Sequence, residues 1–194
     1  FIAGTAWVTC LAMLIAVPPS VLIALYLVEY ARPALRGFMK PVLDVLAGIP
    51  SVVYGVWGLI VVVPLVQRVI ARGLQPLSGS IPLLRSDNPT GYSVLAGSLV
   101  LSVMVAPVIV AISYEVLQAV PRGLREAGLA LGTTRWQMIK HIVFRKAAPG
   151  LAAAVGLGFS RAFGETMAVL MVVGNVPRVP SSIFDPAYPL PALI

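Results

Sequence analysis

Long apolar stretches alternate with shorter polar segments along this chain. Four of the stretches are long enough to cross a bilayer, which takes about 20 residues of helix. They run roughly from Ala6 to Val28, Leu43 to Val66, Val94 to Leu117 and Ala147 to Val173. Lipid offers the backbone no hydrogen-bond partners, so we expect each stretch to be helical. Strands of a β-barrel would alternate apolar and polar residues, and these stretches do not. The pattern predicts an all-α fold, a polytopic transmembrane helical bundle.

The composition supports a membrane location for the whole chain. Of its 194 residues, 59% are hydrophobic and 11% are charged, whereas soluble domains carry about 25% charged residues. The mean hydropathy of +0.95 is too high for a surface solvated by water. The first stretch lacks the basic start of a signal peptide and is too long for one. Because apolar sequence reaches both Phe1 and Ile194, we interpret residues 1–194 as a single transmembrane domain that is a fragment of a longer protein.

Basic residues concentrate in two of the loops, and this predicts the orientation of the chain. The loops from Glu29 to Val42 and from Gln118 to Lys146 hold nine of them, and the other two flanks hold four, including Arg72 and Arg85. Cytoplasmic loops carry an excess of Lys and Arg, so we place the first two loops on the cytoplasmic side. The net charge of +7 then follows from topology and does not indicate nucleic acid.

The loop over residues 118–146 predicts two short amphipathic helices with a bend at Gly132. Pro121 suits the first turn of a helix, and Thr133 or Thr134 can cap the second one. A short helix held at the membrane face can transmit a push from a cytoplasmic partner. The chain lacks the glycine-rich sequence that cradles the phosphates of ATP (G-x-x-x-x-G-K-S/T), so any ATP hydrolysis belongs to another polypeptide.

Two ionisable residues, Arg161 and Glu165, lie in the fourth apolar stretch. A charge at the bilayer centre costs about 2.5–3.5 kcal/mol on insertion scales, so such residues generally face a cavity or a partner. Positions four apart share a helix face, and Glu165 can therefore neutralise Arg161. The planar guanidinium suits an oxyanion such as phosphate. We expect a transient oxyanion site here, and the alternative is a structural ion pair between helices.

Three more polar residues are weaker candidates for the same pathway. Ser51 and Tyr54 follow Pro50, where a helix break would free backbone groups for an anion. Thr166 adjoins Glu165. Packing roles are the alternative for all three. With one Cys and one His in the chain, a cluster of catalytic or metal-binding side chains is not expected.

The cytoplasmic loop resembles the EAA loop of ABC importer permeases. The matching residues are Glu126, Ala127 and Gly128, then Gly132 after three residues and Ile142 after nine more. The family pattern ends in Leu-Pro, where this chain has Phe144 and Arg145. The resemblance implies that residues 118–146 form a cytoplasmic coupling loop, whose helix docks in a cleft of the ATPase subunit.

Three further segments are similar to the PstC type of phosphate permease: Gly48–Gly55, Arg161–Leu170 and Ser182–Pro186. The resemblance implies a permease domain of the type I ABC importer (MetI-like) class in the bacterial cytoplasmic (inner) membrane. It implies a non-catalytic pore subunit that carries inorganic phosphate by alternating access and binds no cofactor or metal, with ATP and Mg²⁺ on a partner. The implied partners are membrane lipid, a PstA-like second permease subunit, PstB-like ATPase subunits and a periplasmic phosphate-binding protein. Permeation of another oxyanion, sulfate or molybdate, and ion-coupled secondary transport are the alternatives.

Overall fold

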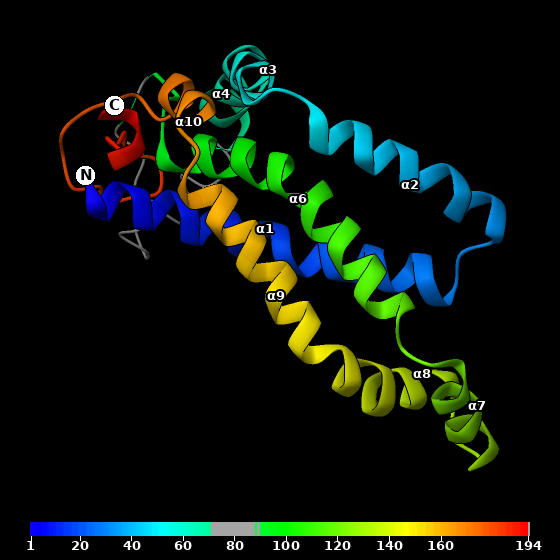
Figure 1. The fold of residues 1–194 in the computed structure, drawn as a ribbon. Helices are drawn as coiled ribbons and strands as arrows, with labels where there is room; N and C mark the ends of the chain where they lie inside the picture. The colour runs from blue at the N-terminus through cyan, green and yellow to red at the C-terminus, as the bar shows by residue number, and fades with distance from the viewer. Residues whose placement is uncertain (71–87, 89, 194) are drawn as a thin grey trace. The chain divides into compact units, whose positions relative to one another are not determined.

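A computed structural model describes residues 1–70, 88 and 90–193, and most of these are helical (Figure 1). The flank that holds Arg72 and Arg85 lies outside the described residues. Within the described ranges, β pairing is limited to an isolated bridge between Gly174 and Ala187. The helices are α1 (Ile2–Glu29), α2 (Pro33–Gly48), α3 (Ser51–Trp57), α4 (Val63–Leu65), α6 (Val94–Gln118), α7 (Arg122–Ala130), α8 (Arg135–Met138), α9 (Phe144–Phe163) and α10 (Met167–Val172). The π-helical turns are η1 (Gly58–Val62), η2 (Val66–Ile70) and η4 (Ile139–Val143), and a 3-10 turn, η5, covers Leu190–Leu193.

In the part of the chain that the structure describes, four helical segments are long and apolar enough to cross a membrane: Ile2–Glu29, Ser51–Arg68, Val94–Gln118 and Arg135–Phe163. The all-α, polytopic class predicted from the sequence is confirmed. The first and third segments also agree closely with the predicted bounds. Pro18, Pro19 and Pro107 lie inside these two helices without ending them, as membrane helices tolerate when neighbouring groups satisfy the freed backbone.

The predicted continuous second span from Leu43 to Val66 is wrong. Helix α2 ends at Gly48, and α3 begins only at Ser51. Pro50 lies between them, with φ −58° and ψ 139°. Proline has no N–H to donate and disfavours helical backbone in the residue before it, so the helix is interrupted here. The predicted loop from Glu29 to Val42 is also largely helical, since α2 starts at Pro33.

The predicted bounds of the fourth span, Ala147 to Val173, are wrong at both ends. Helices α8 and α9 are joined through η4 into one uninterrupted segment that begins at Arg135 and ends at Phe163. Glycine has a low helix propensity, and at Gly164 the chain leaves the helix before α10 begins at Met167. Residues Gly164 to Thr166 therefore form a break in what the sequence suggested was one helix.

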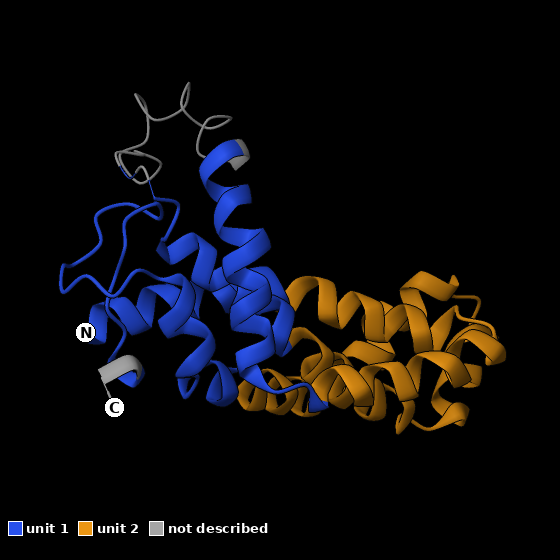
Figure 2. Cartoon of the chain, turned by 90° about the horizontal axis from the view of Figure 1, so that it is seen from above, with its two compact units in different colours: residues 1–16, 48–105, 159–194 blue, residues 17–47, 106–158 orange. Residues whose placement is uncertain are grey.

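The described chain divides into two compact units (Figure 2). Unit 1 comprises Phe1–Ala16, Gly48–Val105 and Phe159–Ile194, and unit 2 comprises Val17–Ala47 and Ala106–Gly158. The interpretation of residues 1–194 as a single domain stays a prediction.

In unit 1, glycines allow α10 and its neighbours to approach closely. Helix α10 packs on α3 and η1. A Cβ atom at Gly55 would lie 2.7 Å from Sδ of Met171, and one at Gly58 would lie 2.4 Å from Cγ2 of Val100. Membrane helices associate through such small residues, because lipid gives no hydrophobic force between them.

The segment from Ser182 to Pro186 caps α6 in the same unit. The backbone N–H groups of Val94 and Leu95 donate to the carbonyls of Asp185 and Ile183, at 3.0 and 2.8 Å. The first N–H groups of a helix have no partner within it, so these bonds satisfy groups that would otherwise be unpaired. The Asp185 carboxylate in turn accepts hydrogen bonds from the backbone N–H groups of Ser181 and Ser182.

Unit 2 has an apolar core between the ends of α1 and α6 and the helical segment that includes α8 and α9. The largest fully buried side chains in it are Leu117, Ile139 and Val143. Gly150 of α9 also meets α6 closely, since a Cβ there would lie 2.5 Å from Cγ1 of Val116.

The glycine contacts of unit 1 lead to a stability prediction. Gly58→Ala places a methyl group against Val100, and overpacking of this kind costs about 1–3 kcal/mol. We expect a lower thermal unfolding midpoint for the full-length protein in detergent. Gly156→Ala in α9 is the matched control, because an added Cβ there meets no described atom within 4 Å. Equal midpoints for the two variants would contradict the packing described.

Candidate functional site

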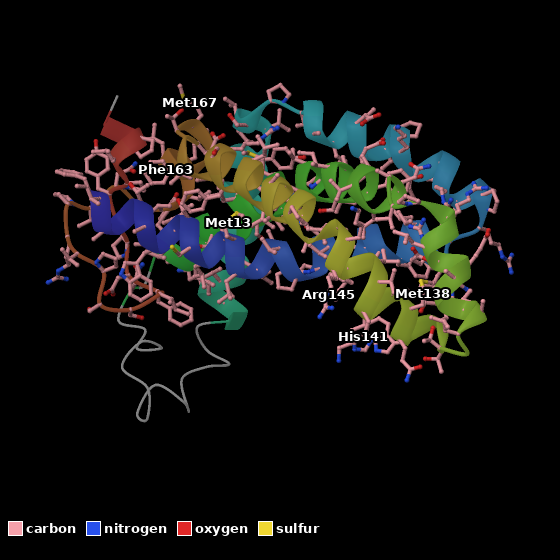
Figure 3. The ribbon with its side chains drawn as sticks, turned by 60° about the horizontal axis from the view of Figure 1, so that its bottom comes forward. Met13, Met138, His141, Arg145, Phe163 and Met167 are labelled. Atoms are coloured by element: carbon pink, nitrogen blue, oxygen red, sulfur yellow. The ribbon has the colours of Figure 1, made fainter. Side chains whose placement is uncertain are left out.

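Three of the predicted pathway residues lie at or next to the break between α9 and α10. Arg161 lies in the last turn of α9, while Glu165 and Thr166 lie in the break itself. All three side chains are half-buried. Because the helix does not continue past Phe163, the prediction that Arg161 and Glu165 share one face of a continuous helix is wrong. Phe163 and Met167, both exposed, flank the break (Figure 3).

The Glu165 carboxylate also satisfies the backbone at the start of α10. Its Oε1 atom accepts a hydrogen bond of 3.2 Å from the backbone N–H of Ala168. This bond satisfies one of the free N–H groups in the first turn of α10, where a negative charge is also favoured. Thr166 precedes α10 without a capping hydrogen bond from its own side chain.

Tyr54 and Arg161 come from distant parts of the sequence and lie near each other in unit 1. The Arg161 guanidinium is within electrostatic range of the buried Tyr54 side chain. Tyr54 reaches this position because α3 packs against α10. Ser51 is the first residue of α3 and is half-buried. The structure therefore brings two of the predicted pathway residues within electrostatic range of each other, and α3, which carries Tyr54, packs on the α10 side of the helix break.

The loop over residues 118–146, which the sequence places on the cytoplasmic side, contains the predicted bend. Gly132 has φ +79°, a left-handed conformation that glycine adopts without steric cost. Thr134 caps α8 through a capping box with Gln137, as the sequence suggested. The second helix is not short, however, because α8 continues through η4 into α9.

The residues of the EAA-like motif divide between the surface and the interior. Glu126 and Ala127 are exposed, and Gly128 is buried. A Cβ atom at Gly128 would lie only 2.5 Å from Cδ1 of Ile142. Gly128 and Ile142, two positions of the motif, are therefore packed against each other. A larger residue than glycine at 128 would collide with the Ile142 side chain.

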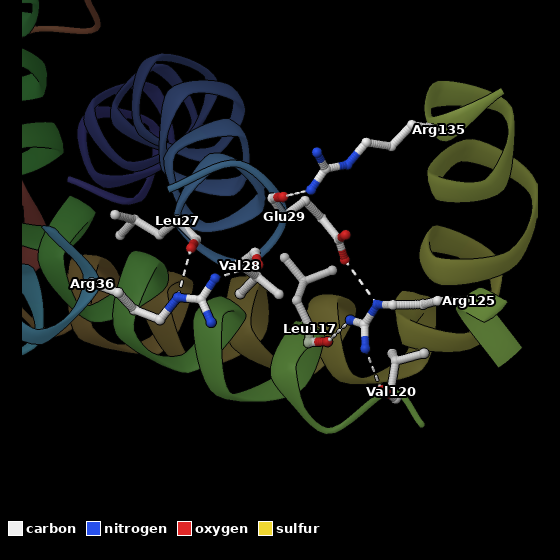
Figure 4. Close-up of polar contacts among 8 residues, drawn as sticks. All are labelled: Leu27, Val28, Glu29, Arg36, Leu117, Val120, Arg125 and Arg135. Atoms are coloured by element: carbon white, nitrogen blue, oxygen red, sulfur yellow. Dashed lines mark hydrogen bonds and ion pairs between the residues drawn. The ribbon is translucent and has the colours of Figure 1, made fainter. Parts of the chain in front are cut away.

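A cluster of charged residues at the ends of α1 and α6 was not identified as a site from the sequence (Figure 4). We call it the arginine clamp, and it consists of Glu29, Arg36, Arg125 and Arg135. Arg125 Nε donates to Glu29 Oε1 at 3.0 Å, and the two side chains are 16% and 6% exposed. Arg125 also donates to the carbonyls of Leu117 and Val120 at the end of α6.

The other two arginines bind the end of α1. Arg36 donates to the carbonyls of Leu27 and Val28, at 3.1 and 2.7 Å. Arg135 donates to the carbonyl of Glu29 and lies over the ring of Tyr30. The last carbonyls of a helix lack internal partners and attract cations. This preference of helix C-termini for cations is the only sequence signal for the cluster. From the sequence, the basic residues of these loops were used only to predict the orientation of the chain.

A second ion pair in unit 2 is solvent-exposed. Lys40 Nζ lies 2.7 Å from Glu115 Oε1, with side chains 59% and 57% exposed. The hydrogen bond and the charge of Glu115 raise the pKa of Lys40 above its ordinary value. Exposed pairs contribute little to stability.

Among the described residues, no three His, Cys, Asp or Glu side chains gather into a possible metal site. The absence of a resident metal or cofactor stays a prediction.

Comparison with known proteins identifies the family. Residues 16–190 match the family described as binding-protein-dependent transport system inner membrane component. The chain is 42% identical over 194 residues to the probable ABC transporter permease protein YqgH of Bacillus subtilis, covering 100% of this chain and 58% of that protein. It is 39% identical over 189 residues to the phosphate transport system permease protein PstC of Pasteurella multocida, covering 96% and 59%. For PstC of Xylella fastidiosa the identity is 40% over 196 residues, covering 100% and 60%.

These similarities confirm the resemblance inferred from the sequence motifs. The chain spans about three-fifths of the length of the curated relatives it matches. The family match extends from the middle of α1 to the first residue of η5, and thus includes both the helix break and the loop over residues 118–146. The chain belongs to the family of binding-protein-dependent transport system inner membrane components.

Proposed function

We propose that this chain is the pore-forming part of a permease subunit in an ATP-driven phosphate importer, and that it works by alternating access. The observation that carries the proposal is that Arg161 lies within electrostatic range of Tyr54, next to a helix break in a chain with helices long enough to span a membrane. Relatives named as phosphate transport system permeases support phosphate as the cargo.

The chemistry of the break suits a transient site for an oxyanion. A guanidinium keeps its charge at all working pH and offers a planar set of donors to phosphate oxygens. A phenol hydroxyl nearby can donate a further hydrogen bond. The Glu165 carboxylate is held on α10, where its charge opposes an anion that approaches Arg161. The repulsion keeps binding weak, which favours release of the cargo. Broken helices next to polar side chains are a recurrent way to bind ions within a membrane.

The cytoplasmic loop supplies the contact with the motor in this proposal. Glu126 and Ala127 are exposed on α7 and are available to an ATPase subunit. Gly128 keeps α7 against Ile142 and the helix that follows. ATP and Mg²⁺ would bind to that partner, and this chain would have no catalytic role. A second permease subunit and a periplasmic phosphate-binding protein complete the proposed assembly in a bacterial cytoplasmic membrane.

Arg161→Gln tests the anion site. We expect the full-length variant to assemble with its partners and to lose phosphate uptake in proteoliposomes, because glutamine carries no charge for the anion. Arg161→Lys should retain partial uptake, since it keeps the charge and loses the planar fork. Labelled phosphate uptake, with and without competing sulfate or molybdate, is the measurement.

Arg178→Gln is the matched control for the loss of a positive charge, because Arg178 is exposed and lies outside the spanning segments. Its uptake should equal that of the wild type. Normal uptake by a correctly assembled Arg161→Gln complex would contradict the anion site. Uptake without ATP would instead favour a secondary transporter, and preference for sulfate or molybdate would change the cargo.

Glu126→Lys tests the proposed docking helix. The substitution reverses the charge of an exposed side chain on α7, and we expect the ATPase subunit to copurify less well and ATP-dependent uptake to fall. Gln118→Lys is the control, because it adds a cation at an exposed position just before α7. If Glu126→Lys bound and coupled the ATPase subunit as the wild type does, α7 would not be the docking element.

A further inference from the structure

The coupling helix α7 has few apolar contacts with the rest of unit 2. Of its nine residues, Gly128 alone is fully buried, and it faces Met138 and Ile142 in the segment that leads to α9. Its leucines, Leu124 and Leu129, are 40% and 46% exposed. The attachment of α7 to α1 and α6 must therefore come from other interactions.

Arg125 supplies that attachment. Its guanidinium is bonded at once to the carboxylate of Glu29, the last residue of α1, and to the Leu117 and Val120 carbonyls at the end of α6. Water reaches the pair poorly, because only 16% of the Arg125 side chain and 6% of the Glu29 side chain are exposed. A buried pair is screened much less than a surface pair and holds a narrower geometry.

We propose that Arg125 and Glu29 are positioning residues that transmit the displacement of α7 to the cytoplasmic ends of α1 and α6. The inference rests on the proposed function, in that it takes α7 as the helix that the ATPase subunit moves. Gly128 transmits the same displacement toward α9 by packing, while Arg125 transmits it to α1 and α6 through charge and hydrogen bonds. Arg36 and Arg135 hold the end of α1 together, so that a force applied at Glu29 acts on the whole terminal turn.

Removing the linkage should uncouple transport from ATP hydrolysis without preventing assembly. The variants are Glu29→Gln, which removes the counter-charge and keeps an acceptor, and Arg125→Lys, which keeps the charge and loses the fork that reaches three acceptors. In the complete transporter, we expect phosphate uptake per ATP hydrolysed to fall about tenfold, within the usual range of coupling between sites. Copurification of the ATPase subunit should not change.

Glu115→Gln is the matched control. It makes the same carboxylate-to-amide change near the end of α6, in an ion pair that is exposed, and it should leave uptake per ATP at the wild-type value. Wild-type uptake per ATP in both Glu29→Gln and Arg125→Lys would overturn the proposal. So would a parallel loss of assembly, hydrolysis and uptake in both variants, because that would indicate a purely structural role.

A distance measurement tests whether Arg125 links α7 to α1, and it does not use phosphate. Spin labels at Tyr26→Cys on α1 and Leu131→Cys at the end of α7 occupy positions that are 52% and 84% exposed, in a background with Cys10→Ser. If Arg125 links the two elements, ATP should leave this distance unchanged in the wild-type complex and should shift or broaden it in Arg125→Lys. The same ATP response in both would overturn the linkage.

The two measurements separate this inference from the proposed function. Failure of the wild-type complex to take up phosphate would contradict the proposed cargo, and the distance measurement would still decide the linkage. Failure of an ATPase subunit to bind the wild-type permease would overturn both.

Discussion

Backbone groups at helix ends must find hydrogen-bond partners, and where those ends are buried water supplies few of them. In unit 2, the carbonyls at the ends of α1 and α6 receive guanidinium groups from Arg36, Arg125 and Arg135. In unit 1, backbone carbonyls of the segment that includes Asp185 satisfy the start of α6, and the Glu165 carboxylate satisfies the start of α10. These charged side chains therefore do more than face the membrane surface: each supplies the hydrogen-bond partner that a backbone group at a helix end lacks.

This requirement gives single residues two tasks. Glu29 ends α1 with its carbonyl bound to Arg135, while its carboxylate holds Arg125. Glu165 caps α10 with its carboxylate, and in the proposed site the same charge opposes an anion at Arg161. A residue that satisfies the backbone is fixed in place, and a fixed charge is more useful for positioning an anion or transmitting a force than a mobile one. Under the proposed function, stability and transport would therefore depend on the same contacts in this chain.

The local features of the fold could be predicted from the sequence, and the long-range ones could not. Gly132 and Thr134 act within a few residues of themselves, so the bend and the cap follow from residue type. The end of α9 at Phe163 was missed because the sequence stays largely apolar through Val173, and Gly164 is a weak signal by itself. Pro50 was expected to disturb the second span, yet proline alone does not distinguish one interrupted helix from two separate helices.

For the candidate site, too, the residue types could be predicted from the sequence and the long-range contacts could not. Arg161 and Glu165 could be selected because charged residues in apolar stretches are costly, and Tyr54 because it follows Pro50. The geometry of Arg161 and Glu165 depended on whether the helix continued past Phe163. Glu29 and Arg125 are 96 residues apart, and no local pattern pairs them. A single sequence records that a cation follows α6 and that a carboxylate ends α1. It does not record that the two meet, because the meeting depends on how α1 and α6 pack in the core around Leu117. Residues that connect elements are therefore the ones that sequence reasoning misses most readily, although transport by alternating access would depend on them.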